Sequence, residues 1–165
     1  MAEKKPKKII FTAVAAAVFL IAAALLIFII TGKDNTSLVL TDGDTGEEYV
    51  SYEVYEGMEF GVSFIHSVNK SEVYEIYEVK GDEIILMQCI YSAFGAGVAT
   101  ETEGDQTLEY TDDGKMIISN INRVMPRLSY IVGTVSDHIL HIDGEEVSLR
   151  ELCGRNSVVR FSIES

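Results

Sequence analysis

Two ionisable side chains, His66 and Glu75, stand in otherwise apolar alternating sets on neighbouring parts of the chain. Alternation in residues 60–66 puts His66 on one face with apolar side chains, and alternation in residues 73–79 does the same for Glu75. A loop near residues 68–71 would bring His66 roughly opposite Glu75 on the inner side of one hairpin. An unpaired buried carboxylate is costly, so we expect the two side chains to share a hydrogen bond.

Three roles are open to such a pair. It can be a polar latch that sets strand register, or half of a ligand or metal site with Ser67, Glu72 or Glu78 nearby. General-base catalysis needs, in addition, a group that orients the base and a group that stabilises the electrophile. The sequence offers no candidate for either group. We therefore expect no catalytic residues and no enzymatic activity.

A glycine-containing segment, Ser92-Ala93-Phe94-Gly95-Ala96-Gly97, follows a long apolar stretch. Glycines permit positive φ values and close backbone approach, although the spacing and the following helix of a phosphate-binding loop are missing. The segment is either a structural turn or a loop that lines a pocket beside His66. The candidate site, structural or ligand-binding, is a cluster of small and polar residues: His66, Ser67, Glu75, Ser92, Gly95 and Gly97.

A calcium site has little support. Asp42-x-Asp44-x-Gly46, with Glu53 further on, superficially resembles a calcium-binding loop. Its fifth and sixth positions are Gly46 and Glu47, where that loop needs an oxygen ligand and a glycine.

The remaining histidines and the cysteines do not form a metal motif either. His138 and His141 fall on opposite faces of a predicted strand, and neither Cys89 nor Cys153 has a second ligand at useful spacing. Cys89 lies in an apolar strand and is most simply a buried hydrophobe, although an exported compartment permits a bridge to Cys153. We expect no metal and no cofactor.

The elements that must position these residues are short strands. Turn signals such as Gly81-Asp82 and Asp112-Asp113-Gly114 separate segments rich in β-branched and aromatic residues. Strands are predicted for residues 37–41, 48–55, 58–66, 73–80, 83–91, 106–110, 115–119, 128–133, 138–142 and 158–163. Residues 148–152 predict one helical turn, and residues 120–128 an irregular link. About nine or ten short strands favour an all-β fold, a sandwich or small barrel.

The N-terminus predicts a membrane anchor. A cluster of lysines precedes the apolar residues 9–30, which as a helix would span roughly 33 Å, enough for a bilayer core of about 30 Å. Residues 1–8 are then a cytoplasmic tail, residues 31–37 a stalk and residues 38–165 an extracytoplasmic β domain. The alternative, a cleaved signal peptide, would need a cleavage site after the apolar run, whereas the Ala-rich sites lie inside it.

The charge of the exported part restricts its partners. Residues 1–33 hold five of the 13 Lys and Arg and one of the 26 Asp and Glu, so the rest of the chain carries 8 basic and 25 acidic side chains, a net charge of −17. Such a surface repels nucleic acid and anionic lipid headgroups. We therefore expect contact with the bilayer only through residues 9–30, and no nucleic-acid partner.

Several motifs together resemble a known family. These motifs are Phe64-x-His66-Ser67-Val68-x-Lys70, then Glu75-x-Tyr77, the segment from Ser92 to Gly97, and the stretch 132–140 with its tail 149–154. They resemble the pattern of the domain of unknown function 1850 family, from about residue 51 to the C-terminus. That resemblance implies a small protein, often with an N-terminal membrane segment, encoded beside TRAP transporters of the TAXI subclass. No catalytic role is established for the family, so none is implied.

The resemblance implies a context of solute uptake at the membrane. We expect a single-pass membrane protein that acts as a non-enzymatic accessory of a TAXI-type TRAP transporter, with the permease or its solute receptor as partner. The first alternative is a small-ligand or metal-binding module centred on His66 and Glu75. The second is an exported hydrolase, which would require a nucleophile within hydrogen-bond reach of His66.

Overall fold

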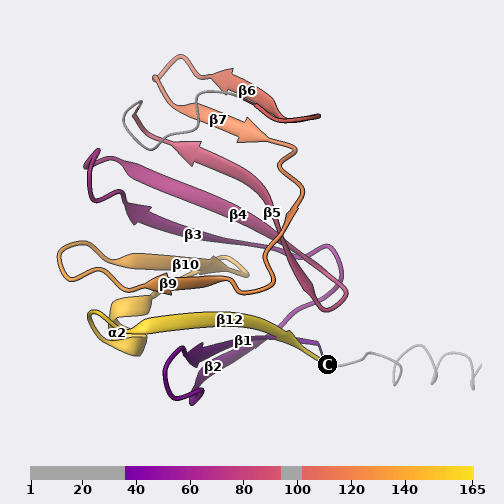
Figure 1. Cartoon of the computed structure of the whole chain (residues 1–165), viewed down its shortest axis with the longest axis vertical. Coiled ribbons are helices and arrows are strands. Elements are labelled where there is room, and N and C mark those ends of the chain that lie inside the picture. Colours follow the sequence, from indigo (N-terminus) through magenta and orange to yellow (C-terminus); the bar gives the residue numbers. More distant parts are fainter. Residues whose placement is uncertain (1–35, 94–101) are drawn as a thin grey trace, which may run out of the picture. The chain divides into compact units, whose positions relative to one another are not determined.

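The computed structural model describes residues 36–93 and 102–165, in which the regular secondary structure is almost entirely antiparallel strands (Figure 1). The strands are β1 (Ser37–Asp42), β2 (Glu48–Glu53), β3 (Glu59–Ile65), β4 (Glu72–Lys80), β5 (Glu83–Tyr91), β6 (Thr107–Tyr110), β7 (Met116–Ser119), β8 (Arg123–Val124), β9 (Ser129–Ile131), β10 (His138–Ile142), β11 (Glu145–Ser148) and β12 (Val158–Glu164). One short helix, α2 (Leu149–Cys153), lies between β11 and β12.

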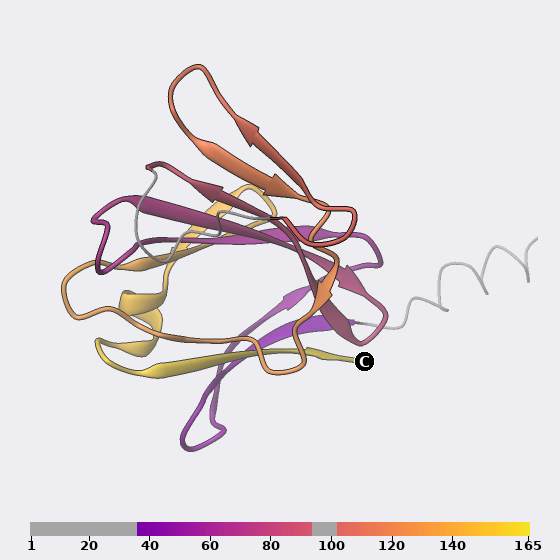
Figure 2. The same ribbon diagram turned by 45° about the horizontal axis from the view of Figure 1, so that its top comes forward.

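The strands form two sheets that face each other (Figure 2). The smaller sheet has the order β2-β1-β12-β9, and the larger has the order β11-β10-β3-β4-β5-β7-β6, with β8 paired to β5. The predicted all-β class is confirmed, and the two antiparallel sheets are those of a sandwich.

The described residues contain 12 strands, more than the sequence predicted. The short strand β8 falls inside the predicted irregular link, where two residues pair with Ile85 and Leu86. The other addition, β11, follows the turn at Asp143 and Gly144, whose φ values are 50° and 78°. Two successive positive φ values are typical of a tight hairpin turn, so the Asp-Gly pair was a usable hairpin signal.

The core lies between the sheets and is built from alternate residues of facing strands. Val62 in β3, Leu140 in β10, Leu38 in β1 and Val159 in β12 are completely buried. Phe161 of the smaller sheet stacks on Phe60 of the larger with ring centroids 6.2 Å apart. Inward-facing residues of the central strands are therefore mostly apolar, while the alternate residues point to the outside of the sandwich.

The predicted helical turn is confirmed as α2, which begins one residue later than expected. Ser148 is its N-cap and accepts a hydrogen bond from the amide of Glu151, and Gly154 ends it with φ of 86°. Its Leu149 side chain is completely buried. The helix thus closes the connection between β11 of the larger sheet and β12 of the smaller.

The two cysteines are free thiols, Cys89 buried and Cys153 partly buried, so the permitted bridge is not formed. In residues 36–93 and 102–165, no helix has both the length and the apolar character needed to cross a membrane. The predicted tail, the anchor helix at residues 9–30 and most of the stalk lie outside the described residues.

Candidate functional site

The predicted hydrogen bond between His66 and Glu75 is wrong. The register of β3 and β4 places Glu75 opposite Val62, and the amide of His66 bonds to the carbonyl of Ser71. The loop between the strands is therefore tighter than expected, and His66 lies two side-chain positions beyond Glu75 on the same face. The Nδ1 atom of His66 instead accepts from the amides of Val68 and Asn69, both at 3.3 Å. His66 orders its own loop.

Glu75 does point inward, as predicted, but its partners are tyrosines. Its Oε2 atom accepts from the Tyr77 hydroxyl at 3.0 Å and from the Tyr130 hydroxyl at 2.5 Å, and the two hydroxyls lie 2.6 Å apart. Glu75 and Tyr77 belong to β4 of the larger sheet, and Tyr130 belongs to β9 of the smaller sheet. The carboxylate therefore links the two sheets across the core.

Burial controls the ionisation of these hydroxyls. It is the largest cause that raises the pKa of Tyr130 and of Tyr77 far above the ordinary tyrosine value, and the charge of Glu75 adds to the effect in both. Both tyrosines therefore remain protonated donors to the carboxylate. The polar latch anticipated from the sequence exists, although it joins two sheets and does not set the register of one hairpin.

The four described residues of the predicted cluster, His66, Ser67, Glu75 and Ser92, do not converge on one site. Ser67 is exposed in the β3–β4 loop, and Ser92 lies on the outer face of the larger sheet, opposite to the side on which Glu75 lies. Gly95 and Gly97 lie outside the described residues. Glu75 and Ser92 lie on neighbouring strands or at their ends, but side-chain alternation places Glu75 on the inner face of the sheet and Ser92 on the outer face.

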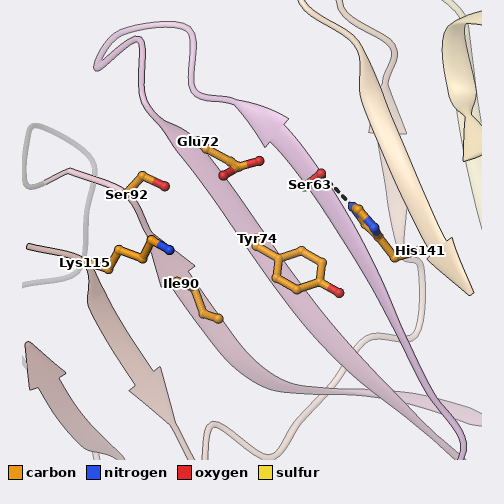
Figure 3. A pocket seen from close by; sticks show the side chains of 7 residues that line it. All are labelled: Ser63, Glu72, Tyr74, Ile90, Ser92, Lys115 and His141. Carbon is orange, nitrogen blue, oxygen red and sulfur yellow. Dashed lines mark hydrogen bonds between the residues drawn. The ribbon is translucent and has the colours of Figure 1, made fainter. Parts of the chain in front are cut away.

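A hollow on the outer face of the larger sheet gathers polar side chains that the sequence did not single out as a group. Its volume is about 220 Å³ and strands β3, β4, β5 and β10 supply most of its walls (Figure 3). The lining residues are Ser63, Glu72, Tyr74, Ile90, Ser92, Lys115 and His141. The strand register indicates this set of residues, because the outward positions of three paired strands carry hydroxyl, carboxylate and phenol groups.

One wall of the hollow is a serine–histidine pair. Ser63 Oγ lies 2.8 Å from His141 Nε2, and His141 Nδ1 lies 3.6 Å from the carboxylate of Glu146 on β11. Ser63 is only 8% exposed, whereas the Glu146 side chain is 75% exposed. A carboxylate near Nδ1 favours the tautomer in which Nε2 accepts and Ser63 donates, which leaves the lone pairs of Ser63 toward the hollow.

Serine, histidine and a carboxylate in this order resemble a nucleophile, its base and an orienting group. The surroundings do not complete a catalytic site. Ser63 lies in a central strand, paired with Ile139 on one side and Tyr74 on the other, so the described backbone amides around it serve the two ladders and form no oxyanion hole. The arrangement can bind a polar group. The hydrolase alternative would require a nucleophile within hydrogen-bond reach of His66, whereas the described hydrogen bonds of the His66 ring come from the amides of Val68 and Asn69.

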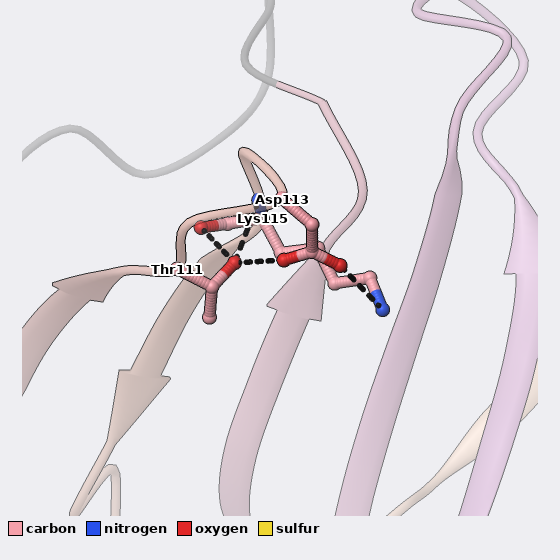
Figure 4. A network of polar contacts seen from close by, with 3 residues as sticks. All are labelled: Thr111, Asp113 and Lys115. Carbon is pink, nitrogen blue, oxygen red and sulfur yellow. Dashed lines mark hydrogen bonds and ion pairs between the residues drawn. The ribbon is translucent and has the colours of Figure 1, made fainter.

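The opposite wall ends in Lys115, which a turn holds in place (Figure 4). The amide of Lys115 donates to Thr111 Oγ1 at 3.0 Å, and its ammonium lies 3.3 Å from the carboxylate of Asp113. A hydrogen bond from the Thr111 hydroxyl, followed by one from Lys115, lowers the pKa of Asp113. The side chains of Lys115 and Asp113 are 46% and 62% exposed, so their ion pair is a weak one that another anion can replace.

A third polar group, around Asp137, is structural. Its carboxylate accepts from the amides of His138 at 2.7 Å and Arg150 at 3.0 Å and from the Ser148 hydroxyl at 2.5 Å, which ties β10 to the start of α2. The guanidinium of Arg150 donates to the carbonyl of Gly133 at 3.1 Å. A Cβ on Gly133 would lie 2.2 Å from the carbonyl oxygen of Ser136, so only glycine fits this loop.

Metal coordination gains no support in the part of the chain that the structure describes, where no three His, Cys, Asp or Glu side chains converge on one point. At Asp42, Oδ1 accepts from the amides of Asp44 and Thr45, both at 2.8 Å, and Oδ2 accepts from the Tyr49 hydroxyl. These hydrogen bonds, with that of Thr45 the largest cause, lower the pKa of Asp42 to about 2. The segment Asp42 to Gly46, which superficially resembles a calcium-binding loop, is thus a turn held by hydrogen bonds to the Asp42 carboxylate.

Comparison with known proteins gives one result. No curated protein and no solved structure matches the chain. The family model "Domain of unknown function (DUF1850)" matches residues 60–149, more than half of the chain. This region contains the β3–β4 hairpin, the outer hollow and the Asp137 group up to the start of α2. The chain therefore belongs to the DUF1850 family.

Proposed function

We propose that this protein is a membrane-anchored, extracytoplasmic accessory of a TAXI-type TRAP solute transporter and that it acts without catalysing a reaction. The observation that carries the proposal is the family match over residues 60–149. The transport context itself is what the resemblance to this family implies, and it is part of the proposal. The charge of −17 on residues 34–165 and the apolar residues 9–30 agree with an anchored domain outside the cell membrane.

The described polar groups support a binding role over an enzymatic one. His66 is occupied by its own loop, and Glu75 is occupied by two tyrosines. The Ser63–His141 pair stands in a fully paired sheet without an oxyanion hole. A tether would contribute by confining the domain near its partner, which raises the effective concentration of a weak contact.

The decisive experiment measures solute uptake and co-purification together. The tagged full-length protein, extracted in detergent, should co-purify with the permease or its solute receptor. Deletion of the gene should reduce uptake by an otherwise active transporter. A soluble domain without residues 1–33 should rescue uptake less well than a version with an unrelated membrane helix in place of residues 9–30. Uptake that is identical with and without the gene would refute the accessory role.

Exposed valines provide the residue-level version of this test. Val68 in the β3–β4 loop is 68% exposed, and Val135 in the β9–β10 loop is 91% exposed. Both loops lie at the end of the domain away from its C-terminus (Figure 1), because His138 pairs with Phe64 and each loop extends beyond that pair. We propose these two exposed apolar side chains as the contact with the transporter.

Val68→Asp combined with Val135→Asp should therefore reduce co-purification with the transporter at least about fivefold, as expected for loss of more than about 1 kcal/mol of contact energy. Tyr55→Asp is the matched control, because Tyr55 is 67% exposed and precedes β3, away from both loops. Equal losses in the control and the double variant would show that surface charge, and not this end of the domain, is what matters.

A further inference from the structure

We propose that the outer hollow is a binding site for a small zwitterion of the α-amino acid class, which goes beyond the accessory role. The hollow holds one cationic side chain, Lys115 at one side, and one anionic side chain, Glu72 on the central strand β4, together with hydroxyl groups and the apolar Ile90 (Figure 3). That combination is complementary to a molecule with a carboxylate and an ammonium group.

The register places the two charges on one line across three strands. The amide of Ser92 bonds to the carbonyl of Glu72, and Tyr91 pairs with Met116, so Lys115 lies beside Ser92 and Ser92 lies beside Glu72. With strands about 4.8 Å apart, the backbones of Glu72 and Lys115 are separated by roughly 10 Å. Both side chains line the hollow, and the Ser92 hydroxyl lies near them (Figure 3).

The second line of residues supplies the floor and the far wall. Tyr74 pairs with Ser63 on one side and Ile90 on the other, so phenol, hydroxyl and apolar surfaces follow one another directly below the charged line. Ile90 accommodates the carbon atoms of a ligand, and Ser63, held by His141, offers lone pairs to a donor group. A ligand side chain that bears a hydroxyl or amide would reach this wall.

Charge and size narrow the ligand class. The net charge of −17 outside residues 1–33 repels a simple anion at long range, while a zwitterion carries no net charge and still presents a carboxylate to Lys115. A volume of about 220 Å³ is below the range of roughly 300–1,000 Å³ typical of sites for drug-sized ligands. A molecule the size of a small amino acid is appropriate.

The test is calorimetric titration of the purified full-length protein in detergent with glycine, L-alanine and L-serine. Acetate and methylammonium, which carry one charge each, are the comparison ligands. L-Alanine should bind at least about fivefold more tightly than either single-charge ligand, because it engages both Glu72 and Lys115. If none of the three zwitterions binds, or if acetate or methylammonium binds as tightly as L-alanine, the proposal is wrong.

Charge-neutralising variants locate the site. Lys115→Gln and Glu72→Gln should each weaken L-alanine binding at least about fivefold. Lys80→Gln and Glu83→Gln are the matched controls, since these residues pair with each other at the far end of β4 and β5 and do not line the hollow. Unchanged near-ultraviolet circular dichroism confirms that each variant is folded. Equal effects in test and control variants would overturn the assignment, and the calorimetric result does not depend on whether a transporter partner exists.

Discussion

The β3–β4 hairpin presents polar groups to both sides of one sheet, and the two sides use them differently. On the inner side, Glu75 accepts from Tyr77 and Tyr130, and the carboxylate joins the two sheets. On the outer side, Ser63 bonds to His141 within a hollow that is open to solvent. Adjacent positions of the same strands therefore hold the two sheets together on one face and leave polar side chains open to solvent on the other.

The difference comes from the number of partners that each face provides. Between the sheets, three oxygen atoms of Glu75, Tyr77 and Tyr130 lie within 3.0 Å of one another, and aromatic rings pack against Tyr130. Outside, Lys115, which directly precedes β7, and Glu72 of β4 face the hollow, and among the described residues the ammonium of Lys115 pairs with the exposed Asp113. Polar groups that have hydrogen-bond partners within the protein stabilise the fold, whereas polar groups that are open to solvent are available to a ligand.

The largest expected effect comes from removing both hydroxyls inside the core. Tyr77→Phe with Tyr130→Phe should leave the Glu75 carboxylate without its donors and lower the free energy of unfolding by roughly 3 kcal/mol. Adding Glu75→Met should recover most of this loss, because an apolar side chain needs no partner. Urea unfolding followed by near-ultraviolet circular dichroism of tyrosine measures both values. A double variant as stable as the wild type would show that the inner group does not hold the sheets.

Alkaline pH distinguishes the inner tyrosines from exposed ones. The raised pKa values of Tyr77 and Tyr130 mean that the folded protein keeps phenol protons that the unfolded chain releases above pH about 10. Stability present below that pH is therefore lost as pH rises further, with each tyrosine contributing up to about 1.4 kcal/mol per pH unit. In the Tyr130→Phe variant, the free energy of unfolding should fall less steeply with rising pH, by up to about 1.4 kcal/mol per pH unit.

The measurement is the urea midpoint between about pH 10 and pH 12. Tyr55→Phe is the control, because Tyr55 is 67% exposed and is not one of the three hydrogen-bonded residues of the inner group. Identical slopes in the two variants would contradict the assignment of the inner hydroxyls as protonated donors.

The outer pair should matter little for stability. Ser63→Ala should change the free energy of unfolding by less than about 1 kcal/mol, because the His141 side chain is 28% exposed and water replaces the lost hydroxyl. The same urea experiment tests this value against the core variants. A loss comparable to that of Tyr130→Phe would mean that the outer pair, too, is part of the structural framework.

The smallest expected effect concerns the ion pair between Asp113 and Lys115 on the outer face. Asp113 lies 3.3 Å from the ammonium of Lys115 and competes with any ligand carboxylate. Asp113→Asn should therefore tighten L-alanine binding by up to about fivefold, the equivalent of a surface ion pair of about 0.2–1 kcal/mol. Calorimetric titration measures the change, and unchanged or weaker binding would show that Asp113 does not compete.

The strands could be predicted because alternation and turn residues are local signals. Residues 83–91 and 138–142 were predicted with the same bounds that the structure shows, and the helical turn beside Gly154 was found within one residue. The direction in which Glu75 points was also predictable, since its neighbours on that face are apolar.

The partners of the site residues could not be predicted in the same way. The position of His66 depended on the exact length of the β3–β4 loop, and a loop shorter than expected moved it away from Glu75. The contacts of Glu75 with Tyr130 and of Ser63 with His141 join residues 55 and 78 positions apart. Such contacts depend on sheet order, which alternation within single strands does not specify.

The pairing of β1 with β12 has a practical consequence for engineering. Ser37 lies opposite Glu164, so the first and last strands of the domain start and finish side by side. A fluorescent protein or affinity tag joined after Ser165 would therefore sit at that end, away from the loops that carry Val68 and Val135. A short linker between the two ends would also permit circular permutation, with new termini opened in the exposed turn at Asp112 to Gly114.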